Sequence, residues 1–253
     1  MRLPWGWIAG GVGAFAVALV VTLPASQALP RAATLLQARG IAVSASGIDG
    51  TVWSGRLAEA RVAGLSLGAS EWSLSPWRLL LGEAGVDFRL APAGGSLSGR
   101  ARLGADHVAL SGLEGDVPAG VLLQGVSLPL PVEVDGKVTL RIEQLDWRVG
   151  QFEAAAGTLL WRQAAIVSPT PVRLGDLRVA LAPGPNGTLI GKLSDGGGPL
   201  GIAGDLTLGK GSYRLDATLT ARADAEPALA QSLPLLGRPD GKGGYRVTWA
   251  GRI

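Results

Sequence analysis

The chain has 253 residues, of which 47% are apolar, 17% are charged, 39 are glycine and none is cysteine. Without sulfur ligands it cannot form a disulfide scaffold, an iron–sulfur cluster or a cysteine zinc site. Its single histidine cannot supply the paired imidazoles of common metal sites, so we expect neither a metal nor a cofactor. The 23 basic and 20 acidic residues are spread evenly, which indicates no nucleic-acid partner.

The N-terminal segment carries no charge between Leu3 and Pro30. Its most apolar part, residues 5–23, would form a helix about 28 Å long at ~1.5 Å per residue, which matches the hydrocarbon core of a bilayer. We therefore predict a transmembrane helix over residues 5–23 and a cytoplasmic tip over residues 1–4. Arg2, Trp5 and Trp7 are the expected interfacial anchors, with the rest of the chain beyond the membrane.

Two further interpretations concern this segment. It also resembles a signal peptide with a small-residue cleavage site after Ala28, which is the alternative to a retained anchor. Small residues recur at every fourth position, at Gly6, Gly10, Ala14 and Ala18, and would form one stripe along the helix. Such a stripe lets a second transmembrane helix pack closely, although apolar helices rich in glycine and alanine also show it by chance.

The rest of the chain divides into a linker and a β domain. Residues 24–47 are expected to form a juxtamembrane linker with a short helix at 31–39, because Gly40 follows in the C-cap position. Over residues 48–253, short runs of alternating apolar and polar residues are separated by turn-forming residues, which predicts a β domain. Its strands are expected at residues 57–67, 86–90, 97–103, 107–113, 138–149, 151–161, 172–182, 188–193, 200–208, 212–222 and 245–249.

The alternation changes parity near Glu143 and Gln144 and again near Gly175 and Asp176, which predicts β-bulges. Because bulges bend a sheet and strands twist, a long antiparallel sheet is expected to curve. Short helical patterns interrupt the strands at 76–81 and 226–236. The predicted fold class is therefore mainly β. An N-terminal transmembrane helix precedes a long curved antiparallel sheet, a half-pipe or groove with an apolar concave face and one or two short helices.

Three local patterns resemble functional sites, and each has a simpler structural interpretation. Residues 204–211 approach a phosphate-binding loop, but they join two alternating segments and therefore predict a hairpin turn at Gly209, Lys210 and Gly211. His107 could serve as a general base with Asp106 or Asp116, yet no nucleophile motif accompanies it. Asn186 lies in a glycosylation acceptor pattern that is also an ordinary turn. We therefore expect no catalytic, cofactor-binding or metal-binding residues.

Several short segments, in their order and spacing, resemble a known family. These segments are Gly50-Thr-Val-Trp-Ser-Gly55, Glu71-Trp72, Ser75-Pro-Trp-Arg-Leu-Leu-Leu81, Asp135-Gly-Lys-Val-Thr-Leu140, Gly157-Thr-Leu-Leu-Trp161, Leu235-Leu-Gly-Arg-Pro-Asp240 and Gly251. The motif positions are Gly50, Thr51, Trp53, Gly55, Trp72, Pro76, Trp77 and Trp161. Over nearly its whole length the chain resembles the general secretion pathway protein N family (GspN) of type II secretion systems.

This resemblance implies a non-enzymatic, single-pass protein of the cell inner membrane with a periplasmic β domain. Its implied partners are the inner membrane and other type II secretion components, and its implied role is to support assembly or export of folded periplasmic proteins across the outer membrane. The family brings no catalytic residues. A weaker architectural similarity to AsmA-like proteins implies an alternative, a lipid-binding or lipid-transfer module that holds phospholipid in an apolar β groove.

Overall fold

The computed structural model describes residues 24–38, 42–62, 64–79, 82–123, 132–209 and 211–252. The predicted transmembrane segment, its small-residue stripe and its interfacial anchors lie outside these residues. Among the helices that are described, none combines the length and the apolar character needed to cross a membrane.

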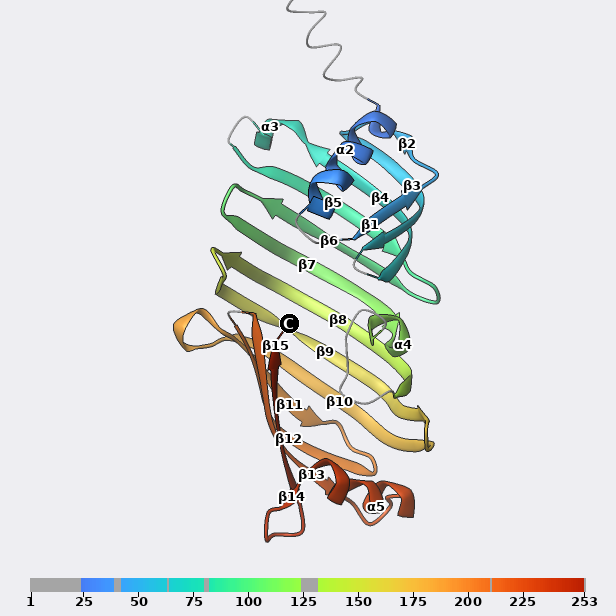
Figure 1. The fold of residues 1–253 in the computed structure, drawn as a ribbon, viewed down its shortest axis with the longest axis vertical. Coiled ribbons are helices and arrows are strands. Elements are labelled where there is room, and N and C mark those ends of the chain that lie inside the picture. Colours follow the sequence, from blue (N-terminus) through green and yellow to red (C-terminus); the bar gives the residue numbers. More distant parts are fainter. Residues whose placement is uncertain are drawn as a thin grey trace, which may run out of the picture.

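The described residues form one open antiparallel sheet of 15 strands, which confirms the predicted β architecture (Figure 1). Nearly every strand pairs with its neighbours in sequence, in the order β1-β3-β4-β5-β6-β7-β8-β9-β10-β11-β12-β13-β15-β14, and β2 pairs with β3. The strands are β1 (Val43–Ser46), β2 (Asp49–Gly50), β3 (Ser54–Val62), β4 (Leu65–Ser75), β5 (Ala84–Ala91), β6 (Ser96–Leu103), β7 (His107–Pro118), β8 (Glu133–Arg148), β9 (Gln151–Ser168), β10 (Val172–Pro183), β11 (Leu189–Asp195), β12 (Leu200–Gly209), β13 (Ser212–Ala221), β14 (Arg238–Pro239) and β15 (Tyr245–Arg252).

Short helices accompany the sheet. They are α2 (Ala25–Ala38), α3 (Pro76–Leu79), α4 (Ala119–Leu123), α5 (Pro227–Leu236) and the 3₁₀ turn η1 (Pro185–Gly187). The helix expected at 31–39 begins earlier, at Ala25, and contains Pro30. The helices expected at 76–81 and 226–236 correspond to α3 and α5, whereas the sequence pattern did not predict α4.

One predicted strand is wrong. Residues 57–67 do not form a single strand, because β3 ends at Val62 and β4 begins at Leu65. Gly64 adopts the left-handed region, with φ +84°, and turns the chain there. Leu57, Leu65 and Leu67 share one parity, but a bulge between Leu57 and Ala60 moves Ala60 and Val62 to the other parity before the turn. This interruption concealed the turn, and most of β4 was missed. Strand β1, which pairs with β3, was also missed and lies within the expected linker.

Both predicted bulges are confirmed. The register between β8 and β9 shifts between Ile142 and Gln144, so that Glu143 is the additional residue. The register between β9 and β10 shifts on both sides of Gly175, whose φ is +93°. These bulges change the strand direction, and Figure 1 shows β5–β10 running obliquely across the long axis while β12, β13 and β15 run nearly along it.

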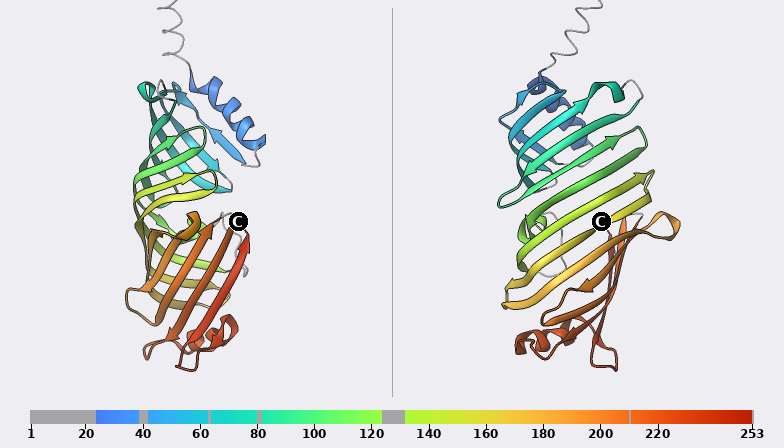
Figure 2. Two further views of the ribbon diagram at one scale, coloured as in Figure 1. Left: turned by 90° about the vertical axis from the view of Figure 1, so that its left-hand side faces the viewer. Right: turned by 180° about the vertical axis from the view of Figure 1, so that it is seen from behind.

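The sheet curves towards its apolar face, which we call the inner face. One core cluster joins Ala164 of β9 and Leu174 of β10 to Leu219 of β13, Val247 of β15 and Leu233 of α5. Residues from nonadjacent strands meet in this cluster because the sheet curves, so that the C-terminal strands face the concave side of β9 and β10, as Figure 2 shows. A second cluster places Ala119 of α4 beside inner-face residues of β7 and β8. Helices α4 and α5 therefore cover parts of the inner face.

Glycines on the inner face allow neighbouring strands to approach closely. A Cβ atom added at Gly157 would lie 2.8 Å from the backbone oxygen of Arg141, and one added at Gly204 would lie 2.6 Å from the Cβ of Ala217. A Cβ at Gly115 would collide with the backbone of Ser96. Side chains on a concave face crowd together, so these positions accept only glycine while the sheet keeps its curvature.

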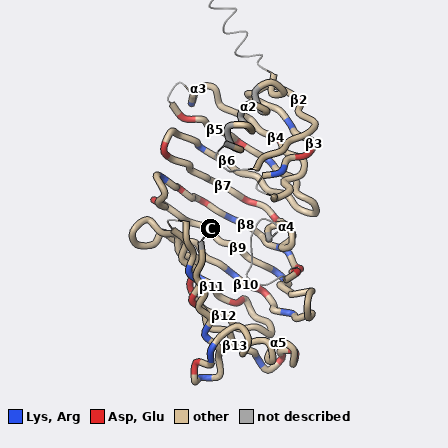
Figure 3. Tube along the Cα trace, in the orientation of Figure 1, with Lys and Arg blue, Asp and Glu red and all other residues tan. Residues whose placement is uncertain are grey.

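The outer face is polar and carries charges of both signs, spread along the sheet in Figure 3. Cross-strand ion pairs link Arg100 to Asp87 at 2.7 Å and Arg246 to Asp216 at 2.7 Å. The Arg246 guanidinium donates hydrogen bonds to Asp216 and holds the pKa of that carboxyl below its ordinary value. The pairs are exposed, so each contributes little to stability.

A carboxylate at the end of β11 connects this strand to β12 and to Arg222, the residue that follows β13. Asp195 accepts hydrogen bonds from Arg222 and from the backbone N–H groups of Ile202 and Gly197. Burial acts to raise the pKa of Asp195, but these donors outweigh it and hold the pKa below its ordinary value. Because the folded pKa is the lower one, the resulting stabilisation is present above the unfolded pKa of about 3.9 and is lost as pH falls through the folded pKa.

We expect Asp195→Asn to lower the free energy of unfolding by about 1–2 kcal/mol at pH 7, since a neutral amide cannot satisfy these three donors. The difference from wild type should shrink below about pH 4. Urea unfolding at pH 7 and pH 3 measures both effects. Asp205→Asn, at an exposed position on β12, is the control and should change stability little. A pH-independent difference would contradict the electrostatic explanation.

Candidate functional site

The motif Gly50-Thr-Val-Trp-Ser-Gly55 forms a tight turn between β2 and β3. The backbone N–H of Thr51 donates to the carbonyl of Ser54 at 2.9 Å, and Gly50 has φ +98°, which favours glycine. Trp72 of β4 lies against this turn. Its Nε1 donates to the carbonyl of Val52 at 3.0 Å, and a Cβ at Gly55 would lie 2.6 Å from its ring. These motif residues therefore stabilise one local structure.

The same turn receives the N-terminal segment of the described chain. Pro24 forms an isolated β-bridge with Thr51, immediately before α2 begins. The carbonyl of Trp53 accepts a hydrogen bond from the backbone N–H of Leu74 at 2.6 Å, close to the end of β4. The motif turn therefore connects the start of α2 to the end of β4.

Two other motif tryptophans differ from each other in burial. Trp161 of β9 packs against both core clusters, and its Nε1 donates to the carbonyl of Asp135 at 3.0 Å. A Cβ at Gly136 would lie 2.7 Å from that Nε1 atom, so Gly136 leaves space for the indole. Trp77, which follows Pro76 in α3, is 76% exposed. Trp161 is a packing residue, whereas Trp77 contributes little to the core.

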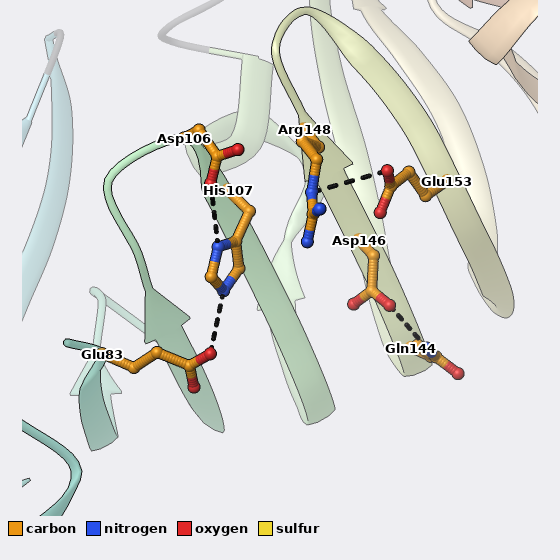
Figure 4. A network of polar contacts seen from close by, with 7 residues as sticks. All are labelled: Glu83, Asp106, His107, Gln144, Asp146, Arg148 and Glu153. Carbon is orange, nitrogen blue, oxygen red and sulfur yellow. Dashed lines mark hydrogen bonds and ion pairs between the residues drawn. The ribbon is translucent and has the colours of Figure 1, made fainter. Parts of the chain in front are cut away.

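His107 begins β7 within a polar group that Figure 4 shows from close by. Its Nδ1 lies 3.4 Å from Asp106 Oδ1, and its Nε2 lies 3.6 Å from Glu83 Oε1. Nearby, Arg148 and Glu153 form an ion pair at 3.5 Å. Asp146 accepts a hydrogen bond from Gln144 through Oδ2, whereas its Oδ1 is buried without a partner among the described residues. Carboxylates therefore face both nitrogens of the imidazole.

This polar group does not form a nucleophilic triad. The hollow beside His107 has a volume of about 220 Å³, and no serine, threonine or tyrosine is among the residues that line it in the described chain. Asp116 lies near the opposite end of β7, where it accepts a hydrogen bond from Thr139 at 2.6 Å. The structure therefore brings Asp106, but not Asp116, to His107.

The other sequence candidates are turns. Gly209 pairs with Ser212 across a two-residue connection between β12 and β13, so the segment resembling a phosphate loop is a hairpin, as predicted. Asn186 lies in the turn η1 with φ +56°. Among the residues that the structure describes, no group of three or more His, Cys, Asp or Glu side chains is placed to hold a metal ion.

An exposed apolar surface occupies the ends of β6, β7 and β8, and we call Leu103, Val108, Trp147 and Val149 the rim patch. Leu103 pairs with Val108, and Val108 with Trp147, so these three side chains lie side by side on the inner face. Leu103 and Trp147 are exposed, and Val149 in the following turn is 72% exposed. The polar group of His107 lies at the same strand ends but on the outer face, because the pair His107–Arg148 alternates with the pair Val108–Trp147. Exposed apolar side chains that gather in this way are typical of an interaction surface.

The predicted apolar groove is present in part. A cavity of about 360 Å³ lies between α2 and strands β1, β3, β4 and β5, and its lining includes Ala33, Leu57, Trp72, Phe88 and Leu90. Farther along the inner face, α4 and α5 fill the concavity. The inner face is therefore covered in several sections and exposed at the rim patch, rather than forming one continuous apolar channel.

The chain is similar to known proteins over most of its length. The family model described as type II secretion system (T2SS), protein N, matches residues 42–248. The type II secretion system protein N of Aeromonas hydrophila is 30% identical over 243 residues, and that of Vibrio cholerae serotype O1 is 28% identical over 252 residues. Each alignment covers 93% of both chains. No solved structure gives a significant match. The resemblance noted from the motifs is confirmed, and the chain belongs to the type II secretion system protein N family.

Proposed function

We propose that this type II secretion component is a non-enzymatic assembly protein of the cell inner membrane. In this proposal, residues 1–4 are cytoplasmic, residues 5–23 span the membrane, and residues 24–47 link the anchor to a periplasmic β domain over residues 48–253. The stripe of Gly6, Gly10, Ala14 and Ala18 is available to a partner helix, and Arg2, Trp5 and Trp7 anchor the span at the interface.

The rim patch is the observation that carries the assembly role. Family membership implies other secretion components as partners. A partner needs an accessible surface, and the rim patch offers three exposed apolar side chains, at the end of β6, at the end of β8 and in the turn that follows β8. Most other apolar residues of the inner face pack against α4, α5 or neighbouring strands. A lipid-transfer role gains no support from the comparisons and is not part of this proposal.

We expect Val149→Asp to weaken partner binding by about 2 kcal/mol, which is roughly thirtyfold in affinity, because the carboxylate would be desolvated in an apolar contact. Val149 has φ +45°, a conformation that aspartate accepts more readily than valine, so folding should be unaffected. In a strain lacking the native gene, the variant should restore secretion of a folded periplasmic cargo several-fold less well than the wild-type gene does.

Val167→Asp is the matched control. Val167 is an exposed valine near the C-terminal end of β9, whereas the rim patch lies beside the N-terminal end of that strand. It should support wild-type secretion at equal cellular abundance, judged by immunoblot. Co-purification of the other inner-membrane secretion components should fall for the Val149 variant alone. Full secretion with the Val149 variant, at normal abundance and with normal co-purification, would refute docking through the rim patch.

A further inference from the structure

Helix α3 presents an indole ring to solvent at one end of the sheet. Pro76–Leu79 forms a single helical turn directly after β4. Trp77 is 76% exposed and is among the most exposed large apolar side chains of the described chain. Leu79 is also exposed. Between them, Arg78 lies against Gly85, where an added Cβ would collide with its aliphatic stem. A fixed α3 therefore carries an aromatic, a cationic and an aliphatic side chain in succession.

The position of α3 indicates what covers Trp77. Pro24, where the described chain begins, bridges to Thr51, and two residues later Trp53 bonds to Leu74, just before α3. Both Figure 1 and Figure 2 show α3 and the start of α2 at the same end of the sheet. The residues preceding Pro24 are the uncharged segment proposed to span the membrane. The bilayer surface would then face this end of the sheet.

We infer that Trp77 and Leu79 insert into the interfacial layer of the bilayer and form a second membrane contact beside the anchor. Tryptophan favours this layer because its ring is apolar while its N–H bonds to headgroups or water, and Arg78 can reach lipid phosphates. A single transmembrane helix leaves a domain free to tilt, whereas two separated contacts fix its orientation. The inference rests on the proposed membrane anchor, and the closing experiment separates the two.

The absence of native cysteine makes single-cysteine labelling specific. We would reconstitute the full chain in phosphatidylethanolamine–phosphatidylglycerol vesicles and attach an environment-sensitive fluorophore to Leu79→Cys, which leaves Trp77 in place. Phe15→Cys reports the proposed anchor, and Leu235→Cys, at an 86% exposed position on α5, reports the far end. Nitroxide-labelled lipid should quench position 79 at least about twofold more than position 235, because an interfacial probe lies within reach of the lipid.

Adding Trp77→Ser should return the quenching at position 79 to the level at position 235. If position 79 behaves like position 235 while position 15 is quenched, the inference is overturned and the anchor stands. If neither position 15 nor position 79 is quenched by lipid, both the proposed anchor and the proposed membrane contact of α3 are refuted. If position 79 is shielded from aqueous iodide but not quenched by lipid, a protein covers α3, and the membrane contact is also overturned.

Discussion

Gly204→Val is expected to lower the free energy of unfolding by about 3 kcal/mol, at the upper end of the usual cost of overpacking. Gly204 of β12 pairs with Ala217 of β13 on the inner face, and an added Cβ would meet the Cα of Ala217 and the carbonyl oxygen of Asp216. Both are backbone atoms, so no side-chain rotation relieves the collision. The two strands would have to separate, which weakens their hydrogen-bonded ladder and opens the curve of the sheet.

Gly201→Val tests whether this cost comes from the inner face. Gly201 lies on the same strand, but an added Cβ would approach nothing closer than 3.5 Å, an ordinary contact. Urea unfolding of the two variants should therefore differ by about 2–3 kcal/mol, since a tolerated surface change alters stability by about 0.5 kcal/mol at most. Equal losses in both variants would mean that the glycines of β12 do not set the curvature.

Alternation of apolar and polar residues was sufficient to predict the sheet, because an antiparallel strand with one covered face shows that period directly. The bulges at Glu143 and Gly175 were predictable for the same reason, since a parity switch in the sequence is a parity switch in the strand. The turn at Gly64 was not predictable from this period, because a bulge between Leu57 and Ala60 interrupts the alternation of β3 just before the turn. The alternation of residues indicates which face a side chain occupies, but at Gly64 it did not indicate where the chain reverses direction.

The rim patch could not be predicted from the sequence. Leu103 and Val149 close the strands expected at 97–103 and 138–149, and Trp147 shares the parity of buried neighbours, so all three resemble core residues. Their exposure depends on where α4 and α5 lie, because these helices cover other parts of the inner face. One feature of the sequence could have indicated that Val149 is exposed: it directly precedes Gly150, a glycine in a turn.

The motif tryptophans show why a family motif does not assign a role. Trp72 and Trp77 belong to neighbouring segments, yet Trp72 lies between β3 and β5 against the motif turn, whereas Trp77 is exposed on α3. The indole ring of Trp72 fits against the motif turn because Gly55, its cross-strand partner, has no side chain. Sequence identifies the residue type, whereas the cross-strand partner determines whether the indole stabilises the fold or remains available to a surface.

Trp72→Ala is accordingly expected to lower the free energy of unfolding by about 3 kcal/mol, because it removes a large packed ring and leaves the carbonyl of Val52 without its indole donor. Trp72→Phe should cost about 1 kcal/mol, since it keeps most of the ring but loses the hydrogen bond. Trp77→Ala is the matched control and should cost less than about 0.5 kcal/mol in detergent solution, where no bilayer covers α3. Thermal unfolding of the three purified variants measures these differences. If Trp77→Ala were as damaging as Trp72→Ala, Trp77 would be a packing residue and its assignment to the membrane surface would be wrong. A loss below about 1 kcal/mol for Trp72→Ala would refute the packing role of Trp72.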